Sequence, residues 1–443
     1  MRIDSLRIQA YRSLYDVHLR PSPFLVLVGP NNSGKSNLSE ALDFLGDTYE
    51  LGLEFAITRK GGFESIAHRR QRRTKQPLTI SITVSFSAED LSRRPRSVLQ
   101  PQRRVLFDQP DQAVIRLEHS FSIAAATQRR DTDFHIRHER IHISQVKKHD
   151  ALDGARLPMT IERKHNEVDF HVSRKRGRTQ NPKDRVRFDS PFYPLIESDF
   201  QSFLRQQVTD TELLVKHLDY TPILMLFQRD LAATRLYQLS PLECRQPGVV
   251  TPNANIDEHG RNLPALVHLM QRRYPQEWKR VLRAMDKILP ELTDVSIGFT
   301  HDRRITLQFH EDSVGRPWTP EDMSDGTIQT LALFAALHDP RSPLAIVEEP
   351  ENSIHPWIIR SFVDSCREIG YKHIILTTHS PALIDYLRPS EVVVIWRQYG
   401  RTKLVPLLEL APGAEDDWAH GRLTVFQLLD SGLLPEAIPA GYR

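Results

Sequence analysis

The sequence has few cysteines and no long apolar run, and both absences narrow the class of protein. Its 443 residues include only Cys244 and Cys366, which lie far apart and lack the spacing of metal ligands. A disulfide framework or a zinc site is therefore not expected. No stretch approaches the roughly 18 apolar residues that a membrane-spanning helix needs. The N-terminal residues MRIDSLRIQAYRSL contain no apolar core of signal-peptide type, so we expect a cytoplasmic protein with no membrane association.

The charge of the chain is nearly balanced overall but unevenly distributed. The formal net charge is +3 at pH 7, yet residues 59–190 hold 29 lysines and arginines against 16 aspartates and glutamates. That segment therefore carries about +13, and the remainder carries about −10. Such asymmetry between segments can mark a nucleic-acid surface. A solvated, loop-rich insertion would have the same composition, and the sequence leaves both interpretations open.

A glycine-rich loop follows an early apolar run. The run FLVLV is followed by GPNNSGKSN, and Gly29 to Ser36 fits the pattern G-x-x-x-x-G-K-S/T. Gly29 and Gly34 permit backbone angles and close approaches that a side chain would block. The backbone N–H groups of such a loop form an anion nest at a helix N-terminus. Lys35 can then reach the β- and γ-phosphates of a nucleotide, and the Ser36 hydroxyl can bind Mg²⁺.

Two further apolar runs end in residues suited to nucleotide chemistry. LAIVEEPE places Glu348 and Glu349 at a strand end, where one can hold Mg²⁺ and the other can polarise a water molecule. A solvated acidic turn is the alternative. IILTTHSP ends in His379, which can contact a γ-phosphate if its strand ends at the same sheet edge. A purely structural histidine is the alternative there.

A third polar turn precedes an amphipathic helix. In MSDGT, Ser324 is a good N-terminal cap and Gly326 leaves the backbone amides accessible. A second anion site at a helix N-terminus follows from this arrangement. Taken alone, the turn is more typical of an ordinary capped helix.

The remaining pattern divides the chain into four segments. Residues 1–58 contain the first strand, the loop and a helix, and residues 59–190 form a basic, β-rich insertion. Residues 191–290 are helical in pattern, and residues 291–443 return to alternating strands and helices. Within the insertion we expect an antiparallel sheet built from four segments, at residues 77–86, 113–123, 134–144 and 166–172. Buried strands that are distant in sequence but all end in polar residues predict one split α/β nucleotide domain.

These motifs, in this order, resemble those of ABC-type ATPases of the SMC/RecF-like branch. The sequence is most similar to stand-alone AAA-type proteins related to OLD-family and phage-defence ATPases. GPNNSGKSN is similar to the Walker A motif, MSDGT to a shortened signature motif, IVEEPENSIHP to Walker B with a D-loop, and TTHSP to the switch histidine. YRSL is similar to an N-terminal motif of the family. The resemblance covers roughly residues 1–50 and 236–400 and implies a P-loop NTPase head of ABC-ATPase type with a split nucleotide domain, an antiparallel β subdomain and a helical insertion.

The resemblance implies a role for each matching residue. It assigns ATP as the substrate and Mg²⁺ as the cofactor. Ser36 and Glu348 would hold Mg²⁺, Glu349 would activate water, and His379 would contact the γ-phosphate. Ser324, Asp325 and Gly326 would cap the γ-phosphate of a second subunit's ATP, with residues 352–355 at the dimer seam. The residues that would contact ATP in the same subunit are Arg12, Ser13, Gly29, Asn32, Gly34, Lys35, Ser36 and Asn37.

Two functions remain open on these observations. The first is an ATP-hydrolysing motor or switch that dimerises, or forms a higher oligomer, around ATP and acts on DNA or on a separately encoded effector or nuclease, in genome maintenance or phage defence. The second is a nucleotide-sensing P-loop scaffold that hydrolyses little. A transporter ATPase is disfavoured by EEPE, by the basic insertion and by the lack of a convincing Gln-loop. There is no long heptad run for an SMC coiled coil and no acidic-cluster nuclease segment after residue 400, which argues against a true SMC protein and against a fused Toprim nuclease.

The basic loops generate a first prediction, on DNA. If residues 69–75 and 173–185 contact phosphates, affinity for duplex DNA should fall steeply as salt is raised, because binding releases counterions. Aromatic residues are sparse in these loops, so base stacking on single strands is disfavoured. Titrating a labelled duplex at increasing ionic strength checks this. Salt-independent binding, or no binding to any nucleic acid, would exclude the DNA interface.

Overall fold

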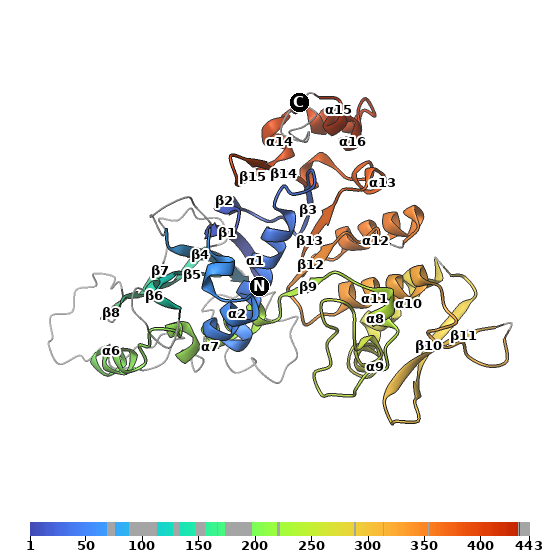
Figure 1. Cartoon of the computed structure of the whole chain (residues 1–443), viewed down its shortest axis with the longest axis horizontal. Helices are drawn as coiled ribbons and strands as arrows, with labels where there is room; N and C mark the ends of the chain where they lie inside the picture. Colours follow the sequence, from blue (N-terminus) through green and yellow to red (C-terminus); the bar gives the residue numbers. More distant parts are fainter. Residues whose placement is uncertain are drawn as a thin grey trace. The chain divides into compact units, whose positions relative to one another are not determined.

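The chain divides into two compact units (Figure 1). Unit 1 comprises Met1–Pro21, Ala41–Ala233 and Gln398–Lys403, and unit 2 comprises Ser22–Glu40, Thr234–Arg397 and Leu404–Arg443. The computed structural model describes residues 1–68, 76–87, 113–126, 133–147, 156–165, 167–172, 197–218, 222–287, 289–312, 314–352, 354–432 and 434. The basic segments at 69–75 and 173–185, on which the DNA prediction depends, lie outside the described residues.

Unit 1 contains an antiparallel sheet with the strand order β2-β1-β4-β5-β6-β7-β8. The strands are β1 (Arg2–Tyr11), β2 (Leu14–Leu19), β4 (Leu78–Ser87), β5 (Ala113–Ala125), β6 (Phe134–Lys147), β7 (Arg156–Lys164) and β8 (Glu167–Val172). In β4, alternate residues from Leu78 to Val84 are buried, as the period of two requires. The predicted antiparallel sheet is thereby confirmed.

The sequence pattern did not predict strand β7. Its segment RLPMTIERK contains a proline, which normally argues against a strand between two partners. The pairing of β6 with β7 shifts register between Ile143 and Gln145, opposite this part of β7. A local irregularity of this kind tolerates a residue without an N–H group.

Unit 2 contains a second sheet, with the strand order β15-β14-β3-β13-β12-β9. Its strands are β3 (Phe24–Val28), β9 (Arg235–Tyr237), β12 (Leu344–Glu348), β13 (His373–Thr378), β14 (Val392–Gln398) and β15 (Arg401–Pro406). From β14 to β9 each neighbouring pair is parallel. Every residue of β3 and β13 is buried, which fits a parallel sheet covered on both faces.

The order of these strands confirms the predicted split α/β domain. In Figure 1 the blue strand β3, from the start of the chain, lies between orange strands from its last third. Strand β3 pairs with β13 and β14, which follow it by more than 340 residues. A nucleotide site at the carboxyl ends of these strands therefore requires both parts of the chain.

Helices complete both units. Those with residues in unit 1 are α1 (Lys35–Leu51), α2 (Leu53–Arg59), α3 (Phe63–Ile66), α6 (Glu197–Gln206), η2 (Leu214–His217) and α7 (Pro222–Ala232). Those of unit 2 are α8 (Pro241–Cys244), α9 (Leu263–Arg273), α10 (Pro275–Asp286), α11 (Asp325–His338), α12 (Pro356–Glu368), α13 (Pro381–Ile384), η3 (Pro389–Glu391), α14 (Leu407–Leu410), α15 (Ala414–Ala419) and α16 (Val425–Asp430), together with the hairpin β10 (Leu292–Phe299) and β11 (Ile305–Glu311). Within 191–290 the described residues form helices α6, η2 and α7 to α10, but also the short strand β9 and a non-helical stretch at 245–262, and the four segment boundaries stay a prediction. Among the described helices, none has the length and apolar character needed to cross a membrane.

Helix α11 lies at the centre of the unit 2 core. Every residue from Thr327 to His338 is buried, and the helix packs against α8, α9, α10 and α12. Its C-terminal end is held by Lys372, whose ammonium donates to the carbonyl oxygens of Ala336 (3.1 Å) and Leu337 (2.9 Å). A cation at the C-terminus of a helix is favourable, and these bonds satisfy carbonyls without a helical partner.

The burial of Lys372 predicts a specific dependence of stability on pH. Desolvation lowers the pKa of Lys372 from 10.5 to about 8, although the nearby Asp339 carboxylate opposes the shift. Between these two pH values the unfolded chain holds a proton that the folded chain has lost. Stability should therefore rise with pH across this window, by up to about 3 kcal/mol from this residue.

Urea denaturation of wild type and Lys372→Met from pH 7.5 to 10 measures this contribution. We expect the free energy of unfolding of the wild type, relative to that of the variant, to increase as pH rises. Parallel curves for the two proteins would contradict the prediction.

Candidate nucleotide-binding site

The glycine-rich loop joins β3 to α1, as the sequence predicts, and its backbone explains its glycines. A Cβ atom on Gly29 would lie 1.9 Å from the carbonyl oxygen of Ile395 in β14, so no other residue fits there. Gly34 has φ +107° and Asn32 has φ +62°, both in the left-handed region. Gly34 accommodates that region freely, and asparagine tolerates it better than most residues. The loop thus adopts the alternating backbone that presents N–H groups to an anion.

Lys35 lies within this loop. The residue is 8% exposed, and its ammonium donates to the carbonyl oxygens of Gly29 (2.6 Å) and Pro30 (3.1 Å). Burial lowers the pKa of Lys35, while the carboxylates of Glu349, Glu348 and Glu351 oppose that shift. The lysine predicted from the start of the chain and the acids predicted more than 300 residues later therefore share one electrostatic environment.

Glu348 forms a half-buried acidic part of the site. It is the last residue of β12. Desolvation raises the pKa of Glu348, and the nearby hydroxyls of Ser39 and Ser36 oppose the rise. Its Oε1 atom is buried without a hydrogen-bond partner in the described structure. An unpartnered carboxylate oxygen beside a serine hydroxyl fits the hard-oxygen ligands that Mg²⁺ prefers.

Glu349 and His379 form the exposed part of the same site. His379 Nδ1 lies 3.0 Å from Glu349 Oε1, and the two side chains are 51% and 37% exposed. The backbone of Glu349 has φ +45°, and its N–H donates to the carbonyl of Thr377 at 2.9 Å. Asn352 Nδ2 donates to Glu349 Oε2 at 3.2 Å. Glu349 is therefore held from two sides in a strained, left-handed conformation.

The structure brings Lys35, Glu348, Glu349 and His379 together, as the sequence analysis required. Two glutamates that are adjacent in sequence are both partly buried but have different environments, since Glu348 has a buried, unpartnered oxygen near two serines and Glu349 lies beside a histidine. The site can thus separate a metal-binding carboxylate from one that is free to act on water. The assignment of these chemical roles stays a prediction.

The signature-like turn lies at the start of α11, in unit 2. Ser324 is the N-cap, and its Oγ accepts from the N–H of Thr327 at 3.2 Å and lies 2.8 Å from the Thr327 hydroxyl. Asp325 is 65% exposed at the first helical position, where it pairs with Arg245. The predicted N-terminal cap is confirmed, whereas contact with a second subunit's phosphate stays a prediction.

Arg12 and Ser13 belong to unit 1, whereas the glycine-rich loop belongs to unit 2. Ser13 Oγ lies 2.7 Å from Thr402 Oγ1, and the backbone N–H of Arg12 donates to Ile66 at 2.8 Å. The prediction that these two residues contact the nucleotide stays untested.

Three residues of the site were not predicted from the sequence. Arg397, after the apolar run EVVVIW, donates from Nη1 to Asn32 Oδ1 at 3.1 Å. Glu351, the last acid of EEPE, accepts from the Thr378 hydroxyl at 2.6 Å. Arg245 contacts the signature-like turn. A polar residue after a buried strand was the available signal for Arg397, whereas Arg245 has no equivalent pattern.

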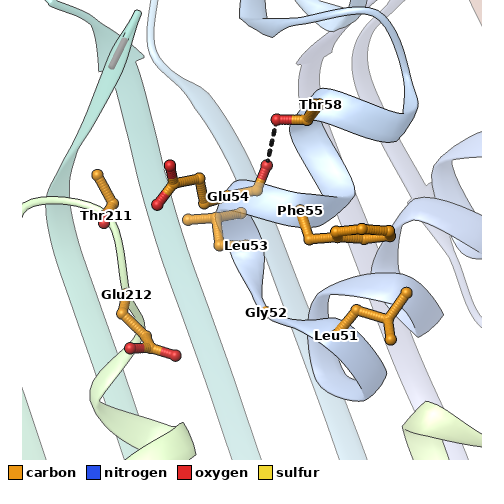
Figure 2. A pocket seen from close by; sticks show the side chains of 8 residues that line it. All are labelled: Leu51, Gly52, Leu53, Glu54, Phe55, Thr58, Thr211 and Glu212. Carbon is orange, nitrogen blue, oxygen red and sulfur yellow. Dashed lines mark hydrogen bonds between the residues drawn. The ribbon is translucent and has the colours of Figure 1, made fainter. Parts of the chain in front are cut away.

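A pocket of about 390 Å³ lies elsewhere, in unit 1. Figure 2 shows its lining residues, which come from the α1–α2 junction and from residues 211 and 212. Thr58 donates to the carbonyl of Glu54 at 2.9 Å, and Arg163 holds the opposite wall through the carbonyl of Glu212. None of its lining residues belongs to the predicted nucleotide set. A phosphate cradle is built from backbone amides along a loop, so the pocket does not mark that site.

The comparisons with known proteins agree with the motif set. The sequence matches the family model described as "AAA domain, putative AbiEii toxin, Type IV TA system" over residues 24–385. No curated protein matches it.

Similar solved structures include three SMC heads. One is an SMC head bound to the C-terminal winged-helix domain of ScpA, at 14% identity, covering 91% of this chain and 98% of that chain with a TM-score of 0.44. A second is the SMC head domain from Thermotoga maritima, at 10% identity, covering 92% and 99% with a TM-score of 0.36. A third, from Pyrococcus furiosus, has an extended coiled coil and is bound to the C-terminal domain of ScpA. It is 14% identical, with 94% and 99% covered and a TM-score of 0.40.

The unpartnered Glu348 oxygen predicts a metal-dependent effect. A ligand that binds only the folded protein raises its stability, by about 2.7 kcal/mol at a hundred times its Kd. We expect ATP with Mg²⁺ to raise Tm more than ATP with EDTA, and Glu348→Ala to remove most of that difference. Differential scanning fluorimetry measures it, with the exposed Glu409→Ala in α14 as the matched control. A full Mg²⁺ effect in Glu348→Ala would show that the carboxylate does not hold the metal.

Proposed function

The chain belongs to the AAA-domain family whose model matches residues 24–385, and from this premise we propose that it hydrolyses ATP between two copies of itself and acts as a switch. It is a P-loop ATPase by its family. Beyond family membership, we propose that the chain turns over ATP, that two copies associate around ATP, and that this association controls an effector.

The geometry around Glu349 supports hydrolysis. Its carboxylate is exposed, is held by Asn352 and lies 3.0 Å from His379 Nδ1. A carboxylate in this position accepts a proton from an attacking water molecule, and the histidine steadies charge that develops on the γ-phosphate. Lys35 neutralises phosphate charge. Ser36 and Glu348 would hold Mg²⁺, which would supply Lewis-acid stabilisation of the phosphate oxygens.

The exposure of two turns supports association of two copies around ATP. Ser324 and Asp325 are exposed at the N-terminus of α11, where a second copy's phosphate could be bound. After residues 352–355, of which Ser353 lies outside the described residues, comes Trp357, whose side chain is 71% exposed. An exposed tryptophan is typical of the centre of a protein interface. In a two-fold dimer, the turn at Ser324 and the segment at 352–355 of each copy would both lie at the interface.

The proposed output of the switch is control of an effector or of DNA. The family description refers to a toxin of a type IV toxin–antitoxin system. We therefore place the chain in cellular defence, where ATP-driven dimerisation would control a separately encoded effector or nuclease. DNA contact through the basic segments at 69–75 and 173–185 remains part of the proposal.

The variant Glu349→Gln tests the proposed hydrolysis. Loss of a general base lowers kcat by about 10²–10⁴-fold. We expect phosphate release to fall in that range while ATP-bound dimers accumulate, because binding persists when turnover stops. Phosphate-release kinetics and light scattering after gel filtration with Mg-ATP measure the two effects.

Two controls make the result specific. Lys35→Ala should neither bind ATP nor dimerise, and Glu409→Gln removes an exposed carboxylate from outside the site and should retain wild-type turnover. Slow wild-type hydrolysis that Glu349→Gln leaves unchanged would instead support the nucleotide-sensing scaffold.

A further inference from the structure

The sequence of the signature-like turn presents an electrostatic conflict. The proposed function requires this turn to approach a triphosphate, yet Asp325 places a carboxylate directly after Ser324. Like charges at such short range disfavour binding, more strongly where water is excluded. Asp325 is 65% exposed, so it is not removed from the surface by burial.

Arg245 resolves this conflict. Its Nη1 lies 2.6 Å from Asp325 Oδ1, its Nε donates to the carbonyl of Pro320 at 2.9 Å, and its Nη2 donates to the carbonyl of Met323 at 2.8 Å. One guanidinium thus neutralises Asp325 and contacts the turn at three points. Lysine could supply the charge, but not three donors in a fixed fork.

The backbone from which the Arg245 side chain extends is itself held in place. Arg245 directly follows α8, which packs against α11, and its side chain is only 17% exposed. Its backbone N–H donates to the carbonyl of Pro241 at 3.2 Å, and the preceding Cys244 is fully buried. The guanidinium therefore reaches the turn from a rigid support, so its contacts cost little side-chain entropy.

The segment that leads into the turn also has hydrogen bonds that do not involve Arg245. Asp322 Oδ2 accepts from the N–H of Thr319 at 2.9 Å and from its hydroxyl at 2.8 Å. Arg245 therefore adds contacts that Asp322 does not make, to Pro320 before it and to Met323 and Asp325 after it. The Ser324 oxygen accepts from the Thr327 N–H while its own proton is able to turn toward an anion.

We propose that Arg245 is the positioning residue of the signature-like turn, which neutralises Asp325 and so allows Ser324 to meet the γ-phosphate held by a second copy of the chain. The inference rests on the proposed ATP-dependent dimer. Because Arg245 acts on the turn and not on the glycine-rich loop, its loss affects association of two copies and leaves each copy's own nucleotide binding intact.

The test uses the full chain carrying Glu349→Gln, in which ATP-bound dimers accumulate. Arg245→Ala and Arg245→Lys are compared with this parent for binding of a fluorescent ATP analogue at low protein concentration. Their dimer dissociation constants with Mg-ATP are measured by analytical ultracentrifugation, and Tm verifies that each variant is folded.

We expect Arg245→Ala to keep the parent's nucleotide affinity within about twofold and to weaken the dimer more than about tenfold, because a paired charge is left alone. Arg245→Lys should fall between the two, since it keeps the charge without the fork. Adding Asp325→Asn to Arg245→Ala should restore part of the dimer affinity, because the repelling carboxylate is then gone. A merely structural arginine would give no such rescue.

The outcomes separate this inference from the proposed function. A parent that does not dimerise with ATP overturns both. A parent that dimerises while Arg245→Ala dimerises equally well overturns the role of Arg245 alone. The role of Arg245 is also overturned if Arg245→Ala loses nucleotide affinity in parallel with dimer affinity, or if Asp325→Asn leaves its dimer defect unchanged.

Discussion

The parallel pairing of β3 with β13, and of β13 with β12, sets the geometry of the whole nucleotide site. Val28 pairs with Thr378, and Thr377 pairs with Glu348. The residues that follow them, Gly29, His379 and Glu349, therefore leave the sheet at the same edge and within one residue of the same level. A slip of one residue would move a strand by about 3.3 Å and turn its side chains to the opposite face. The close approach of Gly29 to the Ile395 carbonyl fixes this arrangement from the β14 side.

Within that frame, the neighbours of each acid, rather than its residue type, set its electrostatic properties. Glu348 is the last residue of β12, and one of its carboxylate oxygens is buried, so desolvation raises its pKa while the hydroxyls of Ser39 and Ser36 oppose the rise. One residue later the backbone of Glu349 turns into the left-handed region, and its carboxylate faces solvent beside His379. Strain of this kind persists only where the surroundings hold it, and here the bonds to Thr377 and Asn352 do so. Two identical side chains thus acquire different electrostatic properties from their places in the fold.

Much of the site follows from local patterns, because each motif carries its own signal. The Walker-type loop, the acids after LAIV and the histidine after IILTT could be located from an apolar run ending in polar residues. That they would meet followed from the topology rule for parallel strands. Arg245 could not be located in this way, since its importance lies in a contact across 80 residues. Arg397 follows an apolar run and so carries the same signal, but its contact with Asn32 spans 365 residues. Strand β7 was missed because the irregular pairing that tolerates its proline is a property of the neighbouring strand.

Helix α11 connects the turn at Ser324 with the strand that precedes His379. One end carries Ser324, and the other is held through Lys372, which directly precedes the strand that ends at Thr378, next to His379. The helix is buried from Thr327 to His338 and is about 21 Å long at 1.5 Å per residue. A close-packed element of this kind does not deform gradually, so it moves with its neighbours or not at all. A partner that engages Ser324 therefore acts on a body that includes the base of the histidine strand. In this way the turn at Ser324 and the start of the strand that leads to His379 are joined by one buried helix and the hydrogen bonds of Lys372.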